Sequence, residues 1–242
     1  MSNARRPKWG LEEAVSAAFS IHEEALKLQT ELESRLDAGI LDGLLSDTNE
    51  LRNDGAVALS KRADRKAATM TQAAALALGT ATVVAMRTAI RRAFPDDKPL
   101  HRELAVGRKV SPHAVGSVVA GLRTVLDAVA ANPEKTRAAG ILPQDIEDAQ
   151  RALAALLAAD QAQDQHSVSA KEAMARRTAT QLRVEAAIGK VLAAAAVAFR
   201  KRPDVLARFE SLVPSHEHRA RRPAKPGASP GACPASDTVT PA

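Results

Sequence analysis

Aromatic residues are scarce in this sequence, which has one Trp, four Phe and no Tyr among 242 residues. Segments of alternating β-branched and aromatic residues, which are typical of strands, are also missing. A core without large rings must be built from Ala, Leu and Val, and such a core suits helices packed on helices better than a sheet. The composition therefore predicts an all-α protein.

Cysteine is nearly absent as well, with Cys233 as the single example. One cysteine excludes a disulfide within the chain and excludes zinc sites of the Cys-rich kind. No hydrophobic segment of the signal-peptide type follows the Met1–Lys8 start, because Glu12 and Glu13 come directly after it. We therefore expect a cytoplasmic protein.

Motifs that carry catalytic chemistry are not found. There is no phosphate-binding P-loop, no dinucleotide fingerprint and no nucleophile elbow. None of the six His follows a Glu by three residues, which excludes a carboxylate-bridged di-iron bundle. His22 is interpreted as a packed side chain on a helix, and His216 and His218 as adventitious metal ligands at most. We expect no enzyme and no catalytic, cofactor-binding or metal-binding residue.

The positive charge is concentrated in the two ends of the chain. The formal net charge is +6, but residues 11–213 hold 27 basic and 26 acidic residues. Candidate contacts to nucleic acid or another anionic surface are therefore in the terminal segments: Arg5, Arg6, Lys8, Arg219, Arg221, Arg222 and Lys225. Contacts of this kind neutralise phosphates without reading sequence. The alternative is that the basic ends only keep a neutral protein soluble.

The stretch Ala67–Met86 is twenty residues long and uncharged. Its length would span a bilayer as a helix, but most of it is Ala and Thr, and few large aliphatic residues favour insertion. A helix that is apolar nearly all round is typical of a central helix covered by its neighbours. We expect no membrane span, and we expect the remaining helices to pack around this stretch.

Helical periodicity and turn residues predict one domain, 11–213, between a basic arm at 1–10 and a disordered Pro/Ala-rich tail at 214–242. Its halves, 11–94 and 112–212, are joined by a linker at 95–111. The predicted helices are 11–36, 56–93, 112–131, 144–202 and 205–212. Turn signals fall at Asn53-Asp54-Gly55 and, less clearly, at 160–167, where a protruding helix or a break with a restart at Ser169 are both open.

A short repeat links the two halves. The segments DAGIL at 37–41 and AAGIL at 138–142 each precede a helix that ends in basic residues, an aromatic and Pro-Asp. The repeat predicts a duplicated helical hairpin, hence an antiparallel four-helix-type bundle with the alternating spacing of a coiled coil. Basic clusters at Arg87–Arg92, Arg200–Arg202 and Arg108-Lys109 are alternative anion sites, although cations at helix ends and a solvated connector also account for them.

The run FPDDKPLHRELAVGRKVS at 94–111 is followed by the segments GLRTVLDAV, NPEKT, AGILPQDIEDA and LAALLAAD. Together these resemble an uncharacterised set of bacterial all-helical proteins over roughly residues 56–213. No activity is attached to that set, so the resemblance implies a helical fold and no function.

The function expected from these patterns is that of a non-enzymatic structural or protein-interaction bundle. Its partner would be another protein or a second copy of the chain. The alternative is sequence-independent binding of nucleic acid or an anionic surface through the basic ends.

Overall fold

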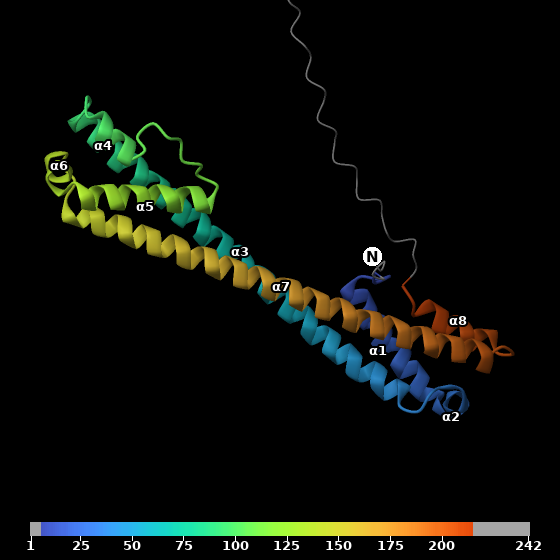
Figure 1. Cartoon of the computed structure of the whole chain (residues 1–242). Helices are drawn as coiled ribbons and strands as arrows, with labels where there is room; N and C mark the ends of the chain where they lie inside the picture. Colours follow the sequence, from blue (N-terminus) through green and yellow to red (C-terminus); the bar gives the residue numbers. More distant parts are fainter. Residues whose placement is uncertain (1–5, 215–242) are drawn as a thin grey trace, which may run out of the picture.

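The computed structural model describes residues 6–214, and every regular element within this range is a helix. Two long helices, α3 (Ile40–Ala93) and α7 (Pro143–Ala198), run side by side and form the body of the molecule (Figure 1). A shorter helix packs against both of them at each end of this pair. The all-α prediction is confirmed, and the molecule is an elongated rod in which the two long helices and one shorter helix pack together at each end.

At one end of the rod, α1 (Leu11–Lys27) packs against α3 and α7. The chain then passes through α2 (Gln29–Leu32) and the 3₁₀ turn η1 (Glu33–Arg35) before α3 begins. Helix α8 (Pro203–Ser211) folds back against the end of α7. The largest fully buried side chains of this core are Ile21, Leu32, Leu44, Leu51, Ile188, Phe199 and Phe209.

The opposite end repeats this arrangement with α5 (Val115–Ala131) in the place of α1. Two short helices, α4 (Lys98–Glu103) and α6 (Pro133–Ala138), flank it. The side chains that fill this second core include Val83, Ile90, Leu100, Leu104, Leu122, Val125 and Leu156. The protein therefore has two hydrophobic cores, one at each end of the rod.

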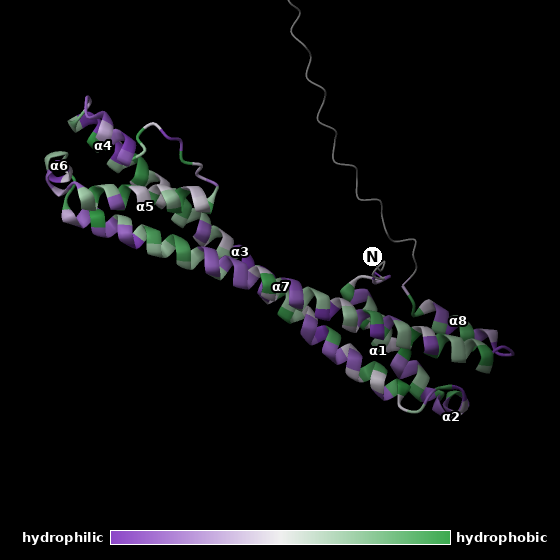
Figure 2. Cartoon of the chain, in the orientation of Figure 1, coloured by the Kyte–Doolittle hydropathy of each residue, from purple (hydrophilic) through white to green (hydrophobic). Residues whose placement is uncertain are grey.

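The waist between the two cores, residues 59–75 of α3 and 160–179 of α7, buries almost nothing. Within it only Ala170 is buried. Hydrophilic residues colour this region in Figure 2, where the two long helices cross. The prediction that the chain packs around Ala67–Met86 is wrong, because only Leu76, Gly79, Val83 and Met86 of that stretch are buried. Alanine makes a helix apolar all round without requiring a cover, since its side chain exposes little area.

Length and composition make α3 the one helix, within residues 6–214, that could cross a membrane. The qualifying 18-residue window has a mean hydropathy of 1.6, and 33% of it is buried inside the protein. Core helices of soluble proteins meet the same criterion, so the window by itself is weak evidence for a span.

The two halves of the chain repeat one another in structure. Gly39 precedes α3 and Gly140 precedes α7 closely, and both have a φ of 79°, the left-handed conformation that glycine adopts without strain. Five buried positions of α1 recur 104 residues later in α5, and eight of α3 recur 105 residues later in α7. For example, Val83 corresponds to Ile188. Each half is thus a short helix, a connector and a long helix.

The correspondence continues beyond the long helices. Phe94 and Phe199 follow α3 and α7 directly, again 105 residues apart. The buried residues Leu100 and Leu104 at α4 correspond in number to Val205 and Phe209 of α8. In the second half the rings of Phe199 and Phe209 stack with centroids 6.1 Å apart, and the Arg202 guanidinium lies 5.5 Å from the Phe199 centroid. A short terminal helix therefore closes each core.

Several predicted boundaries are wrong for reasons of tertiary packing. Helix α3 begins at Ile40 and continues through Asn53-Asp54-Gly55, where a turn was predicted. Gly55 lies under Leu11 of α1 so closely that a Cβ there would be 2.7 Å from Leu11 Cδ2. Of the two alternatives left open at 160–167, the continuous helix is confirmed, because α7 runs through this segment without a restart at Ser169.

Two shorter helices also differ from their predicted ranges. The first predicted helix, 11–36, ends at Lys27, because Leu28 leaves the helical conformation at φ −115° and ψ 22°. Helix α5 begins at Val115 rather than at residue 112. The short helix predicted at 205–212 is confirmed as α8.

Candidate functional site

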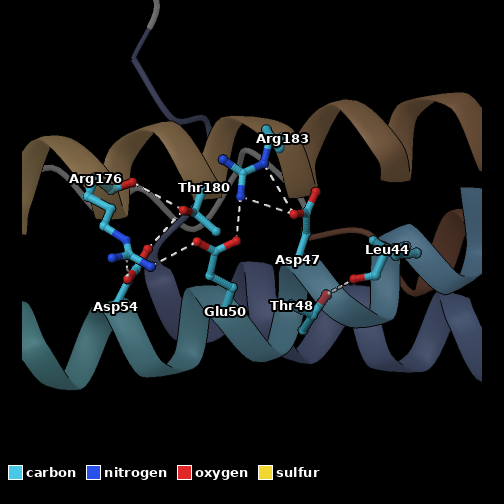
Figure 3. Close-up of polar contacts among 8 residues, drawn as sticks. All are labelled: Leu44, Asp47, Thr48, Glu50, Asp54, Arg176, Thr180 and Arg183. Atoms are coloured by element: carbon cyan, nitrogen blue, oxygen red, sulfur yellow. Dashed lines mark hydrogen bonds and ion pairs between the residues drawn. The ribbon is translucent and has the colours of Figure 1, made fainter.

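Charged side chains bridge α3 and α7 at the α1 end of the rod (Figure 3). Arg183 Nη2 lies 2.6 Å from Glu50 Oε2 and 3.1 Å from Asp47 Oδ1. One turn further along α3, Asp54 Oδ1 lies 3.0 Å from Arg176 Nε, and Thr180 donates a 2.9 Å hydrogen bond to the same carboxylate. Arg176 also reaches Glu50 at 3.1 Å. We call this set, Asp47, Glu50, Asp54, Arg176, Thr180 and Arg183, the ion-pair ladder.

The ladder joins the two long helices through exposed or half-exposed groups, except for Asp54 and Thr180, which are buried. The hydrogen bond to Asp47 raises the pKa of Arg183 above its ordinary value. Isolated pairs at such exposed positions stabilise a protein by about 0–1 kcal/mol each, and shared partners such as Glu50 make a network of them. The ladder thereby closes this face of the α3–α7 seam with polar groups.

The same face at the α5 end carries different residues. Counted by the 105-residue correspondence, Asp47, Glu50 and Asp54 of α3 become Ala152, Ala155 and Ala159 of α7. Arg183 becomes Leu78. Arg176 corresponds to Thr71. Every charged residue of the ladder therefore has an uncharged counterpart at the α5 end. The seam is polar and bridged at one end of the rod, and apolar at the other.

An open groove follows from this replacement. Its volume is about 580 Å³, and it runs between α3 and α7 on the face that α5 does not cover. Leu78 stands at its side with 57% of its surface exposed. Its lining includes Leu78, Thr82, Ala85, Met86, Ala89, Ile141, Ala152 and Ala155, with Asp145, Asp148 and Arg151 at the α7 side. We call this feature the alanine groove.

Charge is distributed unequally along the two long helices, although residues 11–213 are nearly neutral in total. Residues 40–60 of α3 carry one basic and four acidic side chains, whereas residues 61–93 carry seven basic and one acidic. In α7 the order is reversed: residues 143–170 hold five acidic and one basic side chain, and residues 171–198 hold two acidic and five basic. The antiparallel pairing therefore places opposite charges beside each other at both ends.

Of the predicted terminal contacts, the structure describes Arg6 and Lys8, and both are exposed. Arg5, Arg219, Arg221, Arg222 and Lys225 lie outside the described residues. The backbone N–H groups of Lys8 and Trp9 donate to the Glu185 carboxylate at 2.9 and 3.2 Å, and Gln181 donates to the Trp9 carbonyl. These contacts tie the start of the described chain to α7 and leave the Lys8 side chain in solvent.

Within residues 6–214, no group of three or more His, Cys, Asp or Glu is arranged to hold a metal ion. His22, the candidate in the first helix, is 8% exposed and packs in the core of the α1 end. The members of the predicted anion cluster Arg87–Arg92 differ in exposure: Arg87 is buried, whereas Arg91 and Arg92 of the same helix are exposed.

The chain matches no protein-family model, no curated protein and no solved structure. The resemblance to bacterial helical proteins therefore stays a prediction. Sequence patterns alone did not indicate the alanine groove, because it forms between residues of α3 and α7 that are about seventy positions apart. The signal that could have indicated it is the loss of charge at 152, 155 and 159 relative to 47, 50 and 54.

Proposed function

We propose that this chain is a non-enzymatic structural protein, a helical rod that associates with a second copy of itself through the alanine groove. One observation carries the proposal. The same face of the same helix pair is closed by the ion-pair ladder at the α1 end and left apolar and open at the α5 end. Apolar area of this kind is stabilised when a partner removes it from water.

The shape of the groove suits a helix pair as its occupant. Ala85, Ala89, Ala152 and Ala155 project little from the helix backbones, so a second α3–α7 pair can approach closely. Two such pairs, laid groove to groove, give a four-helix packing around the seam, as in coiled-coil bundles. The same surface then serves both copies, which is the commonest arrangement of a homodimer.

Charge favours the arrangement in which α3 of one copy lies against α7 of the other. Residues 61–93 of α3 are strongly basic and residues 143–170 of α7 are acidic, as in the intramolecular pairing. Arg92 lies about one turn beyond Ala89 and is exposed, and Asp145 lines the α7 side of the groove. Across the interface these opposite charges flank the apolar contact, which improves specificity and association rate more than affinity.

The test is a pair of charge insertions into the groove. Ala85→Glu and Ala155→Glu each place a carboxylate in the interface at a residue that is exposed in the single chain, so folding is retained. Ala175→Glu, at an exposed position of α7 outside the groove, is the matched control. By light scattering after gel filtration, we expect the wild type and the control to have twice the chain mass of 25.5 kDa. We expect both groove variants to be monomers.

A wild type that remains monomeric at every concentration would overturn the proposal. So would groove variants whose mass equals that of the wild type. Flotation with phosphatidylcholine vesicles tests whether the groove is occupied by lipid rather than by a second copy of the chain. If the wild type floats with the vesicles and Ala85→Glu does not, the groove binds lipid, and the apolar window of α3 accounts for the binding instead.

A further inference from the structure

Arg87 of α3 is the one Lys or Arg that is buried within residues 6–214, with 8% of its surface exposed. Its Nη1 donates a 3.0 Å hydrogen bond to the carbonyl oxygen of Arg108, in the connector before α5. Its Nε is buried and has no hydrogen-bond partner. The structure gives Arg87 no ion pair with any carboxylate among the described residues, so its buried Nε–H is left without an acceptor.

A cavity of about 290 Å³ lies beside this guanidinium, on the face of α3 that α5 covers. Arg87, Arg108, Lys109, Ser117 and Thr124 contribute its polar lining, and no Asp or Glu lines it. Ser117 Oγ accepts a 3.0 Å hydrogen bond from the Ser111 N–H, which leaves the hydroxyl proton of Ser117 able to donate. Three residues with cationic side chains, of which Arg108 and Lys109 are exposed, and a hydroxyl donor therefore line one small cavity.

Burial of this positive charge has an energetic cost. Burial lowers the pKa of Arg87, and the charge of Arg108 lowers it further. A buried cation is normally paired with an anion, because desolvation of an unpaired charge strongly disfavours the folded state. Nothing within the described chain supplies that anion at Arg87.

The other half of the chain indicates that packing does not require a cation at this position. The counterpart of Arg87 is Leu192, which packs against the core of the α1 end. An apolar side chain thus fills the equivalent place between a long helix and its covering helix. Arg87 is consequently a departure from the repeated pattern, and its explanation must lie in what it contacts.

We propose that the cavity bounded by Arg87, Arg108, Lys109 and Ser117 is a binding site for a phosphoryl group, carried by free phosphate or by a small phosphate monoester. The planar guanidinium of Arg87 offers the paired N–H donors that suit phosphate oxygens, and Lys109 adds a point charge. The cavity exceeds the ~30 Å³ share of a water molecule by roughly tenfold, and it is smaller than typical sites for drug-sized ligands.

The connector is shaped to hold this site together. Ala105 and Gly107 have φ values of 50° and 85°, so the chain turns twice in the left-handed region just before Arg108. A non-glycine residue adopts that conformation at some cost, and the hydrogen bond from Arg87 to the Arg108 carbonyl helps to hold it. Bound phosphate would bridge the same two residues and join the connector to α3.

Titration calorimetry with inorganic phosphate, at constant ionic strength set with sodium chloride, tests the site in the full chain. We expect saturable binding of one phosphate per chain to the wild type. Arg87→Leu reproduces the residue of the other half and is expected to fold and to weaken binding at least tenfold. Arg108→Ala keeps the backbone carbonyl that Arg87 contacts, and it is expected to weaken binding severalfold. Arg91→Leu, exposed on the same helix, is the control and should bind as the wild type does.

A second arm distinguishes the sources of the phosphoryl group. Adenosine monophosphate that binds more tightly than inorganic phosphate, with adenosine itself inactive, assigns the site to a monoester. Equal affinity assigns it to free phosphate. The proposal is overturned if phosphate gives no saturable binding to the wild type, or if both Arg87→Leu and Arg108→Ala bind it as the wild type does. Should Arg87→Leu fail to fold, Arg108→Ala decides the result alone.

Discussion

Leu78 of α3 and Arg183 of α7 occupy the same position in the two halves of the chain, 105 residues apart, and they lie at opposite ends of the seam between the two long helices. Arg183 bonds to Asp47 and Glu50 across that seam, whereas Leu78 stands beside Ala152 and Ala155. The rod therefore carries one polar and one apolar version of the same surface. Exchanging the residues at these positions exchanges the properties of the two ends.

The first prediction makes the polar end apolar. The triple variant Asp47→Ala, Glu50→Ala, Arg183→Leu gives three ladder positions of the α1 end the residues found at the α5 end and keeps the Arg176–Asp54 pair. With two grooves per chain, we expect the variant to form assemblies larger than a dimer, because each copy can then associate at both ends. Sedimentation velocity would detect them. Arg183→Lys preserves the charge and is the control, and a variant that sediments like this control would contradict the prediction.

The second prediction concerns two glycines that lie under covering helices. A Cβ on Gly79 would be 2.8 Å from Val118 Cγ1 and 3.2 Å from Leu122 Cδ1, in the middle of a packed core. Gly79→Ala should therefore lower the free energy of unfolding by about 1–2 kcal/mol, since overpacking outweighs the better helix propensity of Ala. The first atom that Gly55→Ala meets is the end of the Leu11 side chain, which can rotate, so its effect should be near zero.

Urea unfolding followed by the helical circular dichroism signal measures both changes. Gly189→Ala is the matched control, because a Cβ there meets nothing within 4 Å. It should stabilise the protein by roughly 0.5–1 kcal/mol. If Gly79→Ala were as stabilising as Gly189→Ala, the close packing of α3 and α5 would be disproved.

Local patterns predicted the parts of the fold that local chemistry determines. The Gly of DAGIL and of AAGIL lies just before each long helix in the same left-handed conformation. Pro203, predicted as a stop for the preceding helix, lies just beyond α7 and also begins α8. The turn predicted at Asn53-Asp54-Gly55 failed because tertiary contacts outweigh local preference there. Arg176 pairs with Asp54 and Leu11 packs over Gly55, and neither partner is near in the sequence.

The alanine groove and the Arg87 cavity were beyond prediction for a related reason. The groove requires the register that brings Leu78 opposite Ala155, which depends on the pairing of two complete helices. The burial of Arg87 requires a connector to lie over it. The opposite charges of the two halves of α3, and of the two halves of α7, nearly cancel in the summed charge of residues 11–213. A separate count for each half of a helix shows them.

The third prediction uses Trp9, the only Trp of the chain, as a reporter. Glu185 accepts hydrogen bonds from the backbone N–H groups of Lys8 and Trp9, and Glu185→Ala removes them. Hydrogen bonds to a charged group stabilise by about 1.5–3 kcal/mol each, so residues 6–10 should detach from α7. We expect a red shift of the Trp9 fluorescence and faster tryptic cleavage after Lys8. Glu172→Ala, exposed on the same helix, should change neither, and an unshifted spectrum in Glu185→Ala would contradict the prediction.

The fourth prediction concerns the pH dependence of the α5 end. The hydrogen bond from Lys135 holds the pKa of Asp97 below its ordinary value of about 3.9, and the backbone N–H of Leu100 lowers it further. A carboxyl whose pKa is depressed by folding stabilises the protein above its unfolded pKa, and that contribution is lost as the pH falls through the folded pKa. Lys135→Met removes the larger cause, so the pKa of Asp97 should rise toward the ordinary value while the Leu100 contact keeps it below. Carbon-detected NMR titration of the Asp97 carboxyl measures the change. Lys171→Met, on the exposed waist of α7, should leave that titration unaltered, and a pKa that stays equally low in Lys135→Met would show that Leu100 alone is responsible.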